Sequence, residues 1–192
     1  MFDYDFMINA LAAGSIVALL AGAAGFFLVL RGQAFAGHAL SHVGFAGATG
    51  AVLLGLGAFW GLLAFAVGGA VGMGLLGERL AARDVAIGII LSLSLGFGLL
   101  FLHFYTGYAG QATALLFGNV LGVSHATLWS LAALAVLCFA GLAVMARPLL
   151  FASLQPELAE AKGLNLRLLG VLFLTIIAIT VAEAATIVGV LL

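Results

Sequence analysis

The chain has 192 residues, of which 66% are hydrophobic and only 7% are charged, and its formal net charge is −1. About a quarter of the residues of a soluble domain are charged, so most of this surface must face lipid. The near-zero charge excludes binding of nucleic acid by a basic surface. The single cysteine, Cys138, excludes a disulfide framework or a thiolate cluster within one chain.

Six segments are long and apolar enough to be membrane spans, since a helix needs about 20 residues to cross a hydrocarbon core of about 30 Å. They cover residues 6–30, 39–56, 59–76, 85–105, 127–145 and 168–192. Only residues 55–58 separate the second span from the third, which is compatible with a tight turn or with a broken helix. The sequence therefore predicts an all-α polytopic transmembrane bundle of about six spans, forming one domain over residues 1–192.

The basic residues predict the orientation, because short loops rich in lysine and arginine stay in the cytoplasm. All six fall between spans one and two, three and four, or five and six, and they are Arg31, Arg79, Arg83, Arg147, Lys162 and Arg167. These three are every second connection along the chain, so all three can lie on the cytoplasmic side of the membrane at once. The N-terminus and residues 106–124 are then expected outside.

Two connections are not simple turns. Residues 106–124 are too apolar for a free loop and too short for a full span, so we expect a short re-entrant or half-helical segment there. Residues 156–163, PELAEAKG, begin with proline, carry glutamate early and lysine late, and end in glycine. This order predicts a short capped helix on the cytoplasmic surface. Either a partner protein grips this helix or it is a solvated connector, and the pattern leaves both open.

Two of the four histidines, His38 and His42, are four residues apart, which places both imidazoles on one face of a helix. Two imidazoles supply half of a tetrahedral zinc shell, and polar groups inside membrane helices mark pathways. The pair therefore either binds an ion in transit or forms hydrogen bonds with the backbone or with Ser41. Glu183, late in the sixth span, either gates a path together with Asn119 or lies at the outer interface.

The stretch FFLVLRGQAFAGHALSHVGFAGATGAVLLG, residues 26–55, resembles the ABC-3 family of metal-ion permeases, the membrane subunits of zinc and manganese ABC importers. LLFGN at 115–119 is similar to the outer re-entrant segment of that family, and ASLQPELAEAKGLN at 152–165 to its cytoplasmic coupling segment. The final residues, TIVGVLL, resemble the start of its next conserved segment. Such permeases are longer, so we expect this chain to be truncated at the C-terminus.

The resemblance implies a transport subunit, not an enzyme, that moves a divalent metal into the cytoplasm and holds no permanent cofactor. Family members commonly carry aspartate at the position of His38, and this aspartate and the histidine matching His42 are implicated in handling the metal. A neutral imidazole in place of that carboxylate favours zinc over manganese or iron as the cargo.

The resemblance also implies partners and a location. The expected partners are a separate ATP-binding subunit, an extracytoplasmic metal-binding protein, a second copy of the permease and membrane lipid, and the expected location is the bacterial cytoplasmic (inner) membrane. Three groups of functional residues are expected: the transient metal ligands His42 and His38; the ATPase-coupling residues Pro156, Glu157, Ala159, Glu160, Lys162 and Gly163; and the outer-gate residues Phe117, Gly118, Asn119 and Glu183.

Two other functions compete with metal import. One is a permease for chelated iron or a cobalamin-like cofactor, which would not need bare imidazole ligands. The other is a membrane metalloenzyme, because HALSH at residues 38–42 has the H-x-x-x-H spacing of membrane di-iron oxygenases. Four histidines in the whole chain are too few for that type of enzyme.

Overall fold

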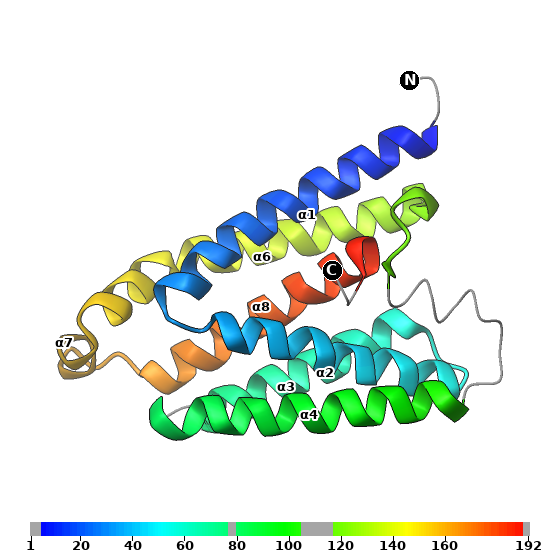
Figure 1. Cartoon of the computed structure of the whole chain (residues 1–192). Coiled ribbons are helices and arrows are strands. Elements are labelled where there is room, and N and C mark those ends of the chain that lie inside the picture. Colours follow the sequence, from blue (N-terminus) through cyan, green and yellow to red (C-terminus); the bar gives the residue numbers. More distant parts are fainter. Residues whose placement is uncertain (1–4, 77–79, 105–116, 190–192) are drawn as a thin grey trace.

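The computed structural model describes residues 5–76, 80–104 and 117–189, and in these residues it contains helices and no strand. The elements are α1 (Asp5–Leu30), α2 (Ala34–Leu53), α3 (Ala58–Leu76), α4 (Leu80–Phe104), the 3₁₀ helix η1 (Val120–Gly122), α6 (His125–Leu154), α7 (Pro156–Ala161) and α8 (Leu166–Val188) (Figure 1). In the described part of the chain, α1, α3, α4, α6 and α8 are long and apolar enough to cross a membrane. The predicted all-α membrane bundle is confirmed.

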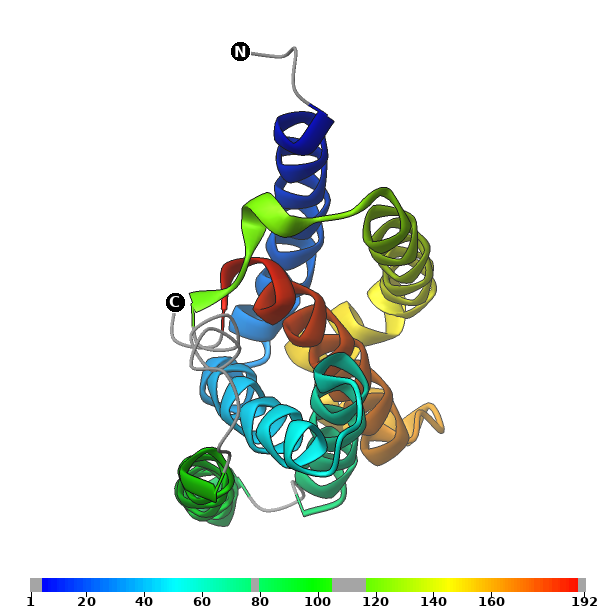
Figure 2. The ribbon, with the colours of Figure 1, turned by 90° about the vertical axis from the view of Figure 1, so that its right-hand side faces the viewer.

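Helix α8 lies in the middle of the bundle, between the pair α1 and α6 on one side and the pair α2 and α3 on the other (Figure 2). Helix α4 packs on the outer side of α2. Half of the most apolar window of α8 is buried within the protein, compared with 11–22% for the other four apolar helices. Those four helices therefore keep large apolar side chains, such as Trp129 and Val144, on the outside, where they can face lipid.

Helix α2 corresponds to the second predicted span, but it is not among the helices apolar enough to cross a membrane. It is sheltered by α3, α4 and α8, so its surface does not need to be as apolar as a lipid-facing one. Gly47 lies against Gly61 of α3, where a Cβ on either residue would collide with the other helix. Such close approach between small residues is how membrane helices associate.

The connection between α2 and α3 is a tight turn and not a break within one helix. Helix α2 ends at Leu53 and α3 begins at Ala58. Gly55 in this turn has a φ of +74°, in the left-handed region that glycine adopts without a steric penalty. The turn brings Gly47 and Gly61 into register.

Helix α6 differs most from the predicted elements. The fifth span was predicted over residues 127–145 with a polar connector after it, but the helix continues through Pro148 to Leu154. Proline removes one backbone hydrogen bond from a helix interior, which usually kinks or ends it. Here Leu149 is buried in the main apolar core together with residues of α8, so tertiary packing holds the helix beyond the proline.

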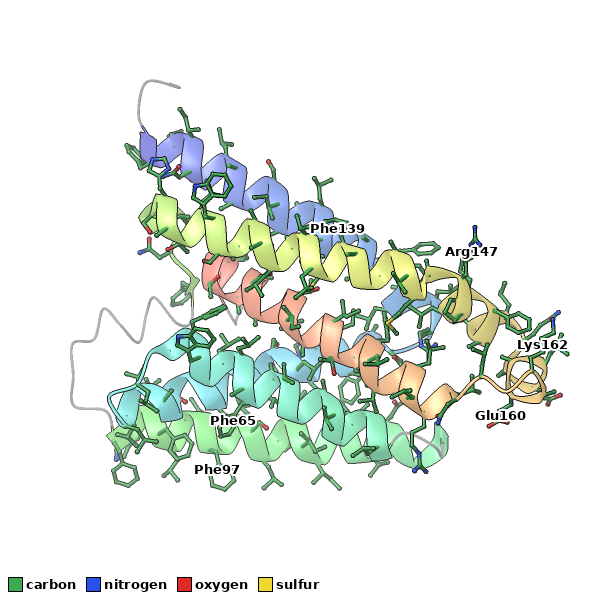
Figure 3. All side chains as sticks on the ribbon, turned by 180° about the vertical axis from the view of Figure 1, so that it is seen from behind. Phe65, Phe97, Phe139, Arg147, Glu160 and Lys162 are labelled. Carbon is green, nitrogen blue, oxygen red and sulfur yellow. The ribbon has the colours of Figure 1, made fainter. Side chains whose placement is uncertain are left out.

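The described basic residues lie at one end of the bundle, which we call the basic end. Arg31 follows α1, Arg147 and Lys162 belong to the α6–α7 end, and Arg167 is in the first turn of α8. Figure 3 shows Arg147 and Lys162 projecting from this end. At the opposite end, the side-chain amide of Asn9 in α1 donates a hydrogen bond of 3.3 Å to the carbonyl oxygen of Val123.

Candidate functional site

The predicted histidine pair lies on one face of α2. The two ring centroids of His38 and His42 are 4.8 Å apart, and the ring planes meet at 84°. His38 is exposed and His42 is half-buried. The hydroxyl of Ser41 donates a 2.7 Å hydrogen bond to the backbone carbonyl of His38, so it is not engaged with an imidazole. The rings are therefore near enough for one nitrogen of each to reach a shared ion after side-chain rotation.

His38 and Ser41 line a groove of about 430 Å³ between α1, α2 and α8. The rest of its wall consists of glycine and small or medium apolar residues, namely Gly14, Val17, Ala18, Ala21, Val181, Ala184, Ala185, Val188 and Gly189. Small side chains leave room for an ion with part of its water shell. On α2, such an ion would meet the imidazole of His38 first, with the ring of His42 next to it.

The pair does not form a closed metal cage. Within the described residues, no group of three or more His, Cys, Asp or Glu side chains is placed to hold a metal. A resident structural zinc site normally has four protein ligands, whereas a transport site must bind weakly enough to release its ion. Whether His38 and His42 act as ligands stays a prediction.

The predicted outer-gate segment lies at the far end of this groove. Gly118 has a φ of +75°, and a Cβ there would collide with the backbone of α8 between Ile187 and Gly189. The side chain of Asn119 accepts a 3.0 Å hydrogen bond from the N–H of Gly122 and so caps η1. Because Val188 and Gly189 also line the groove, this segment meets the groove at the C-terminal end of α8. Residues 105–116, which hold most of the predicted re-entrant segment, lie outside the described residues.

Glu183 belongs to α8, whereas the other predicted gate residues precede η1. It is completely buried in α8, on the opposite side of the helix from Val181, Ala184 and Ala185, which line the groove. It faces the packing between α8 and α6, close enough to Cys138 for an electrostatic interaction. The sequence placed Glu183 at a gate or at the outer interface, and the structure places it inside the bundle.

The predicted coupling helix is present as α7. Pro156 is its first residue, Glu157 is in its first turn, Lys162 is its C-cap, and Gly163 follows with a φ of +83°. This order of residues is the one that predicts a short capped helix from the sequence. Ala159 is buried, so it faces the protein and not a partner.

The outward face of α7 combines charge with an apolar side chain. Glu157 and Glu160 are exposed, and Figure 3 shows Glu160 projecting from the basic end. Leu158 between them is 45% exposed, although an isolated leucine in a helical segment is usually part of a core. The ammonium of Lys162 lies 5.2 Å from the ring centroid of Phe151, which ties α7 to α6. The sequence analysis missed Leu158, because only the helix position shows that it points outward.

Comparisons with known proteins identify the family of the chain. The ABC 3 transport family model matches residues 3–192. The manganese transport system membrane protein MntC of Listeria innocua is 31% identical over 196 residues, covering 100% of this chain and 69% of the relative. The probable metal transport system membrane protein of Treponema pallidum is 34% identical over 196 residues, covering 100% of this chain and 72% of the relative.

A solved structure also matches. PsaBC from Streptococcus pneumoniae in complex with Fab superposes with a TM-score of 0.83 and 27% sequence identity, over 98% of this chain and 68% of the matched chain. These relatives are named for manganese or for metal in general, so they do not support the predicted preference for zinc. Nor do they support the rival functions of chelate permease or membrane metalloenzyme. The chain belongs to the ABC 3 transport family and is a membrane permease of a metal ABC importer.

Proposed function

We propose that this permease moves a divalent transition metal inward along the groove between α1, α2 and α8, with manganese as the first candidate and His42 and His38 as transient ligands. The observation that carries the proposal is the imidazole pair, whose centroids are 4.8 Å apart and of which His38 lines the groove. Relatives named for manganese support that metal. Imidazole is a softer ligand than carboxylate, so zinc is the competitor that must be tested beside it.

We propose a second copy of the chain on the open side of the groove. His38 is exposed in the single chain, and an ion held by two imidazoles needs further ligands or ordered water to lose its hydration shell. A facing copy would supply another pair of imidazoles and exclude lipid from the path. An extracytoplasmic metal-binding protein would then deliver the ion near residues 117–124.

Energy is proposed to come from a separate ATP-binding subunit that contacts α7. The outward face of α7 offers this subunit two carboxylates and one apolar contact, from Glu157, Glu160 and Leu158. Nucleotide binding can change the side of the membrane to which the groove opens only if the ATP-binding subunit contacts α7 differently in the two access states of the permease. The basic end then faces the cytoplasm and the N-terminus lies outside, in a bacterial cytoplasmic membrane, as the positive-inside rule requires.

Metal uptake by cells tests this proposal. The permease is produced with its ATP-binding subunit and binding protein in cells that lack their own manganese and zinc importers, and uptake of radiolabelled Mn²⁺ and Zn²⁺ is measured. His42→Ala should lower uptake of the transported ion at least about tenfold, because half of the protein ligand pair is lost. Greater uptake of Mn²⁺ than of Zn²⁺ by the unaltered protein identifies manganese as the cargo.

The matched control is His103→Ala, which removes an exposed histidine from the C-terminal end of α4. It should keep uptake within about twofold of the unaltered protein, as expected for an exposed residue outside the path. Membrane levels of each variant are measured by immunoblot, so that loss of protein is separated from loss of transport. Normal uptake of both ions by His42→Ala at normal protein levels would refute the role of the pair.

A further inference from the structure

A second and larger cavity, of about 630 Å³, lies at the basic end, where α1, α2, α3, α6, α7 and α8 come together. Its lining includes the polar residues Arg31, Gln33, Glu160, Asn165 and Arg167. None of the residues that line this cavity lines the groove beside His38. The proposed metal path therefore leaves this cavity without a function.

The cavity is suited to an anion. Arg31 and Arg167 place two guanidinium groups in its wall, and the guanidinium of Arg31 lies 5.5 Å from the ring centroid of Phe173. Each guanidinium carries five N–H donors in a planar fork that fits phosphate oxygens, so a contact elsewhere still leaves donors for a ligand. Glu160 contributes one carboxylate to the lining, but it is exposed on α7.

The first turn of α8 adds to this preference. Helix α8 has 23 residues and begins beside the cavity, with Asn165 accepting a 3.0 Å hydrogen bond from the N–H of Leu168. The N-terminus of a helix carries a partial positive charge and favours bound anions. The helix end and the guanidinium of Arg167 therefore act on the same part of the cavity.

Gln33 provides an independent sign of a ligand. Its side chain is only 7% exposed and lines the cavity, and its Oε1 atom has no hydrogen-bond partner among the described residues. A buried polar atom without a partner is costly, so a group that donates a hydrogen bond here would be favoured. Phosphate itself is an acceptor, but a hydroxyl next to it can donate.

We propose that this cavity binds a phosphate group with a neighbouring hydroxyl, as found in the glycerol headgroup of an anionic phospholipid and in soluble glycerol phosphate. The phosphate accepts hydrogen bonds from Arg31 and Arg167, and the hydroxyl donates to Oε1 of Gln33. Basic pockets between membrane helices on the cytoplasmic side are known places for anionic headgroups. The inference uses the proposed orientation of the basic end but does not depend on which metal is transported.

Native mass spectrometry of the permease purified with its ATP-binding subunit tests this proposal. The delipidated complex is titrated with phosphatidylglycerol, phosphatidic acid and phosphatidylcholine. Arg31→Gln and Arg167→Gln should each weaken binding of the first phosphatidylglycerol about fivefold, because one basic residue at a membrane surface contributes about 1 kcal/mol. Gln33→Leu should weaken phosphatidylglycerol but not phosphatidic acid, which lacks the headgroup hydroxyl.

The control is Arg147→Gln, which removes an exposed arginine at the same end that does not line the cavity. It should leave lipid binding unchanged. Displacement of phosphatidylglycerol by millimolar glycerol 3-phosphate, with the same sensitivity to Arg167→Gln, would assign the site to the soluble ligand; resistance to it assigns the site to lipid.

Two results would overturn the proposal: an equal loss of phosphatidylglycerol binding in Arg147→Gln, which means a diffuse positive surface, or phosphatidylcholine binding as tightly as phosphatidylglycerol. Melting midpoints check that each variant is folded, and Arg167 is exposed, so its substitution leaves the apolar core intact. Because no metal enters this experiment, a failure of the proposed transport role would not affect its outcome.

Discussion

The two sides of α2 both face small residues of neighbouring helices but have opposite properties. On one side, Gly47 lies so close to Gly61 of α3 that neither position has space for a Cβ atom. On the other side, His38 and Ser41 face a groove of about 430 Å³. Small residues remove bulk from a helix surface, and the neighbouring helix decides whether the space is closed by contact or left open. The closed side supports the bundle, and the open side is available for an ion.

The largest effect is expected from filling the closed side. Gly47→Leu would force α2 and α3 apart, with a loss of about 3 kcal/mol or more in the free energy of unfolding. The new side chain would collide with the backbone carbonyl of Gly61 and with the Cβ of Phe65, and neither atom can move unless α3 moves. The amount of folded permease in the membrane and its melting midpoint should both fall sharply.

Gly72→Leu is the matched control for that substitution, because it adds the same side chain to α3 where no atom lies within 4 Å of the new Cβ. This variant should remain close to the unaltered protein in yield and melting midpoint. A stable Gly47→Leu variant would show that α2 and α3 are not locked together by this contact.

A smaller effect is expected at the outer end of the open side. Gly118→Ala combines an unfavourable left-handed conformation with a collision against the backbone of α8 between Ile187 and Gly189. Gly55→Ala imposes the same conformation, at a φ of +74°, with no atom within 4 Å. We expect a loss of about 1 kcal/mol for Gly55→Ala and at least about twice that for Gly118→Ala. Denaturant midpoints of the purified complex measure both, and equal losses would mean that the contact with α8 contributes nothing.

Cysteine labelling sharpens the comparison without altering the packing much. In a Cys138→Ala background, Ser41→Cys on the groove side and Ala48→Cys on the buried side are treated with a small water-soluble thiol reagent. Because thiol reactivity requires access, Ser41→Cys should react at least about tenfold faster. Mass spectrometry of the intact protein measures the two rates. Equally slow labelling would show that the groove is closed to water in the assembled protein.

The smallest change is expected from exchanging one ligand type in the groove. His38→Asp replaces a neutral imidazole by a carboxylate, which suits manganese better than zinc. The ratio of Mn²⁺ to Zn²⁺ uptake should rise about threefold to tenfold, with total transport retained. Competition uptake with both labelled ions gives this ratio directly, and an unchanged ratio would place His38 outside the selective step.

Sequence reasoning succeeded where a property depends on neighbours along the chain. Apolar length predicted the long helices, the spacing of His38 and His42 predicted a shared face, and the order of residues from Pro156 to Gly163 predicted α7. Each of these depends on helix geometry or on capping, which act within a few residues. The concentration of basic residues at one end also followed from their alternation along the chain.

Prediction from the sequence failed where packing against a distant segment overrides the structure that neighbouring residues favour. The fifth span was predicted to end before the charge of Arg147, but burial of Leu149 against the core holds α6 in a helix to Leu154. Glu183 was expected either at a gate or at the outer interface, and the burial of its side chain inside the bundle was not visible from the sequence. A role of Glu183 in gating stays a prediction. The metal preference was also inferred from ligand type alone, and the named relatives do not support zinc.

By itself, the sequence determined that the protein lies in a membrane and is helical, and it gave His38 and His42 as candidate metal ligands, because composition and helical periodicity depend only on the order of residues. The tertiary structure alone decided that α8 is central, that one side of α2 is closed and the other open, and that Arg31, Gln33 and Arg167 share a cavity. These features depend on contacts between helices far apart in the chain, whose approach is governed by the fit of side chains on both partners.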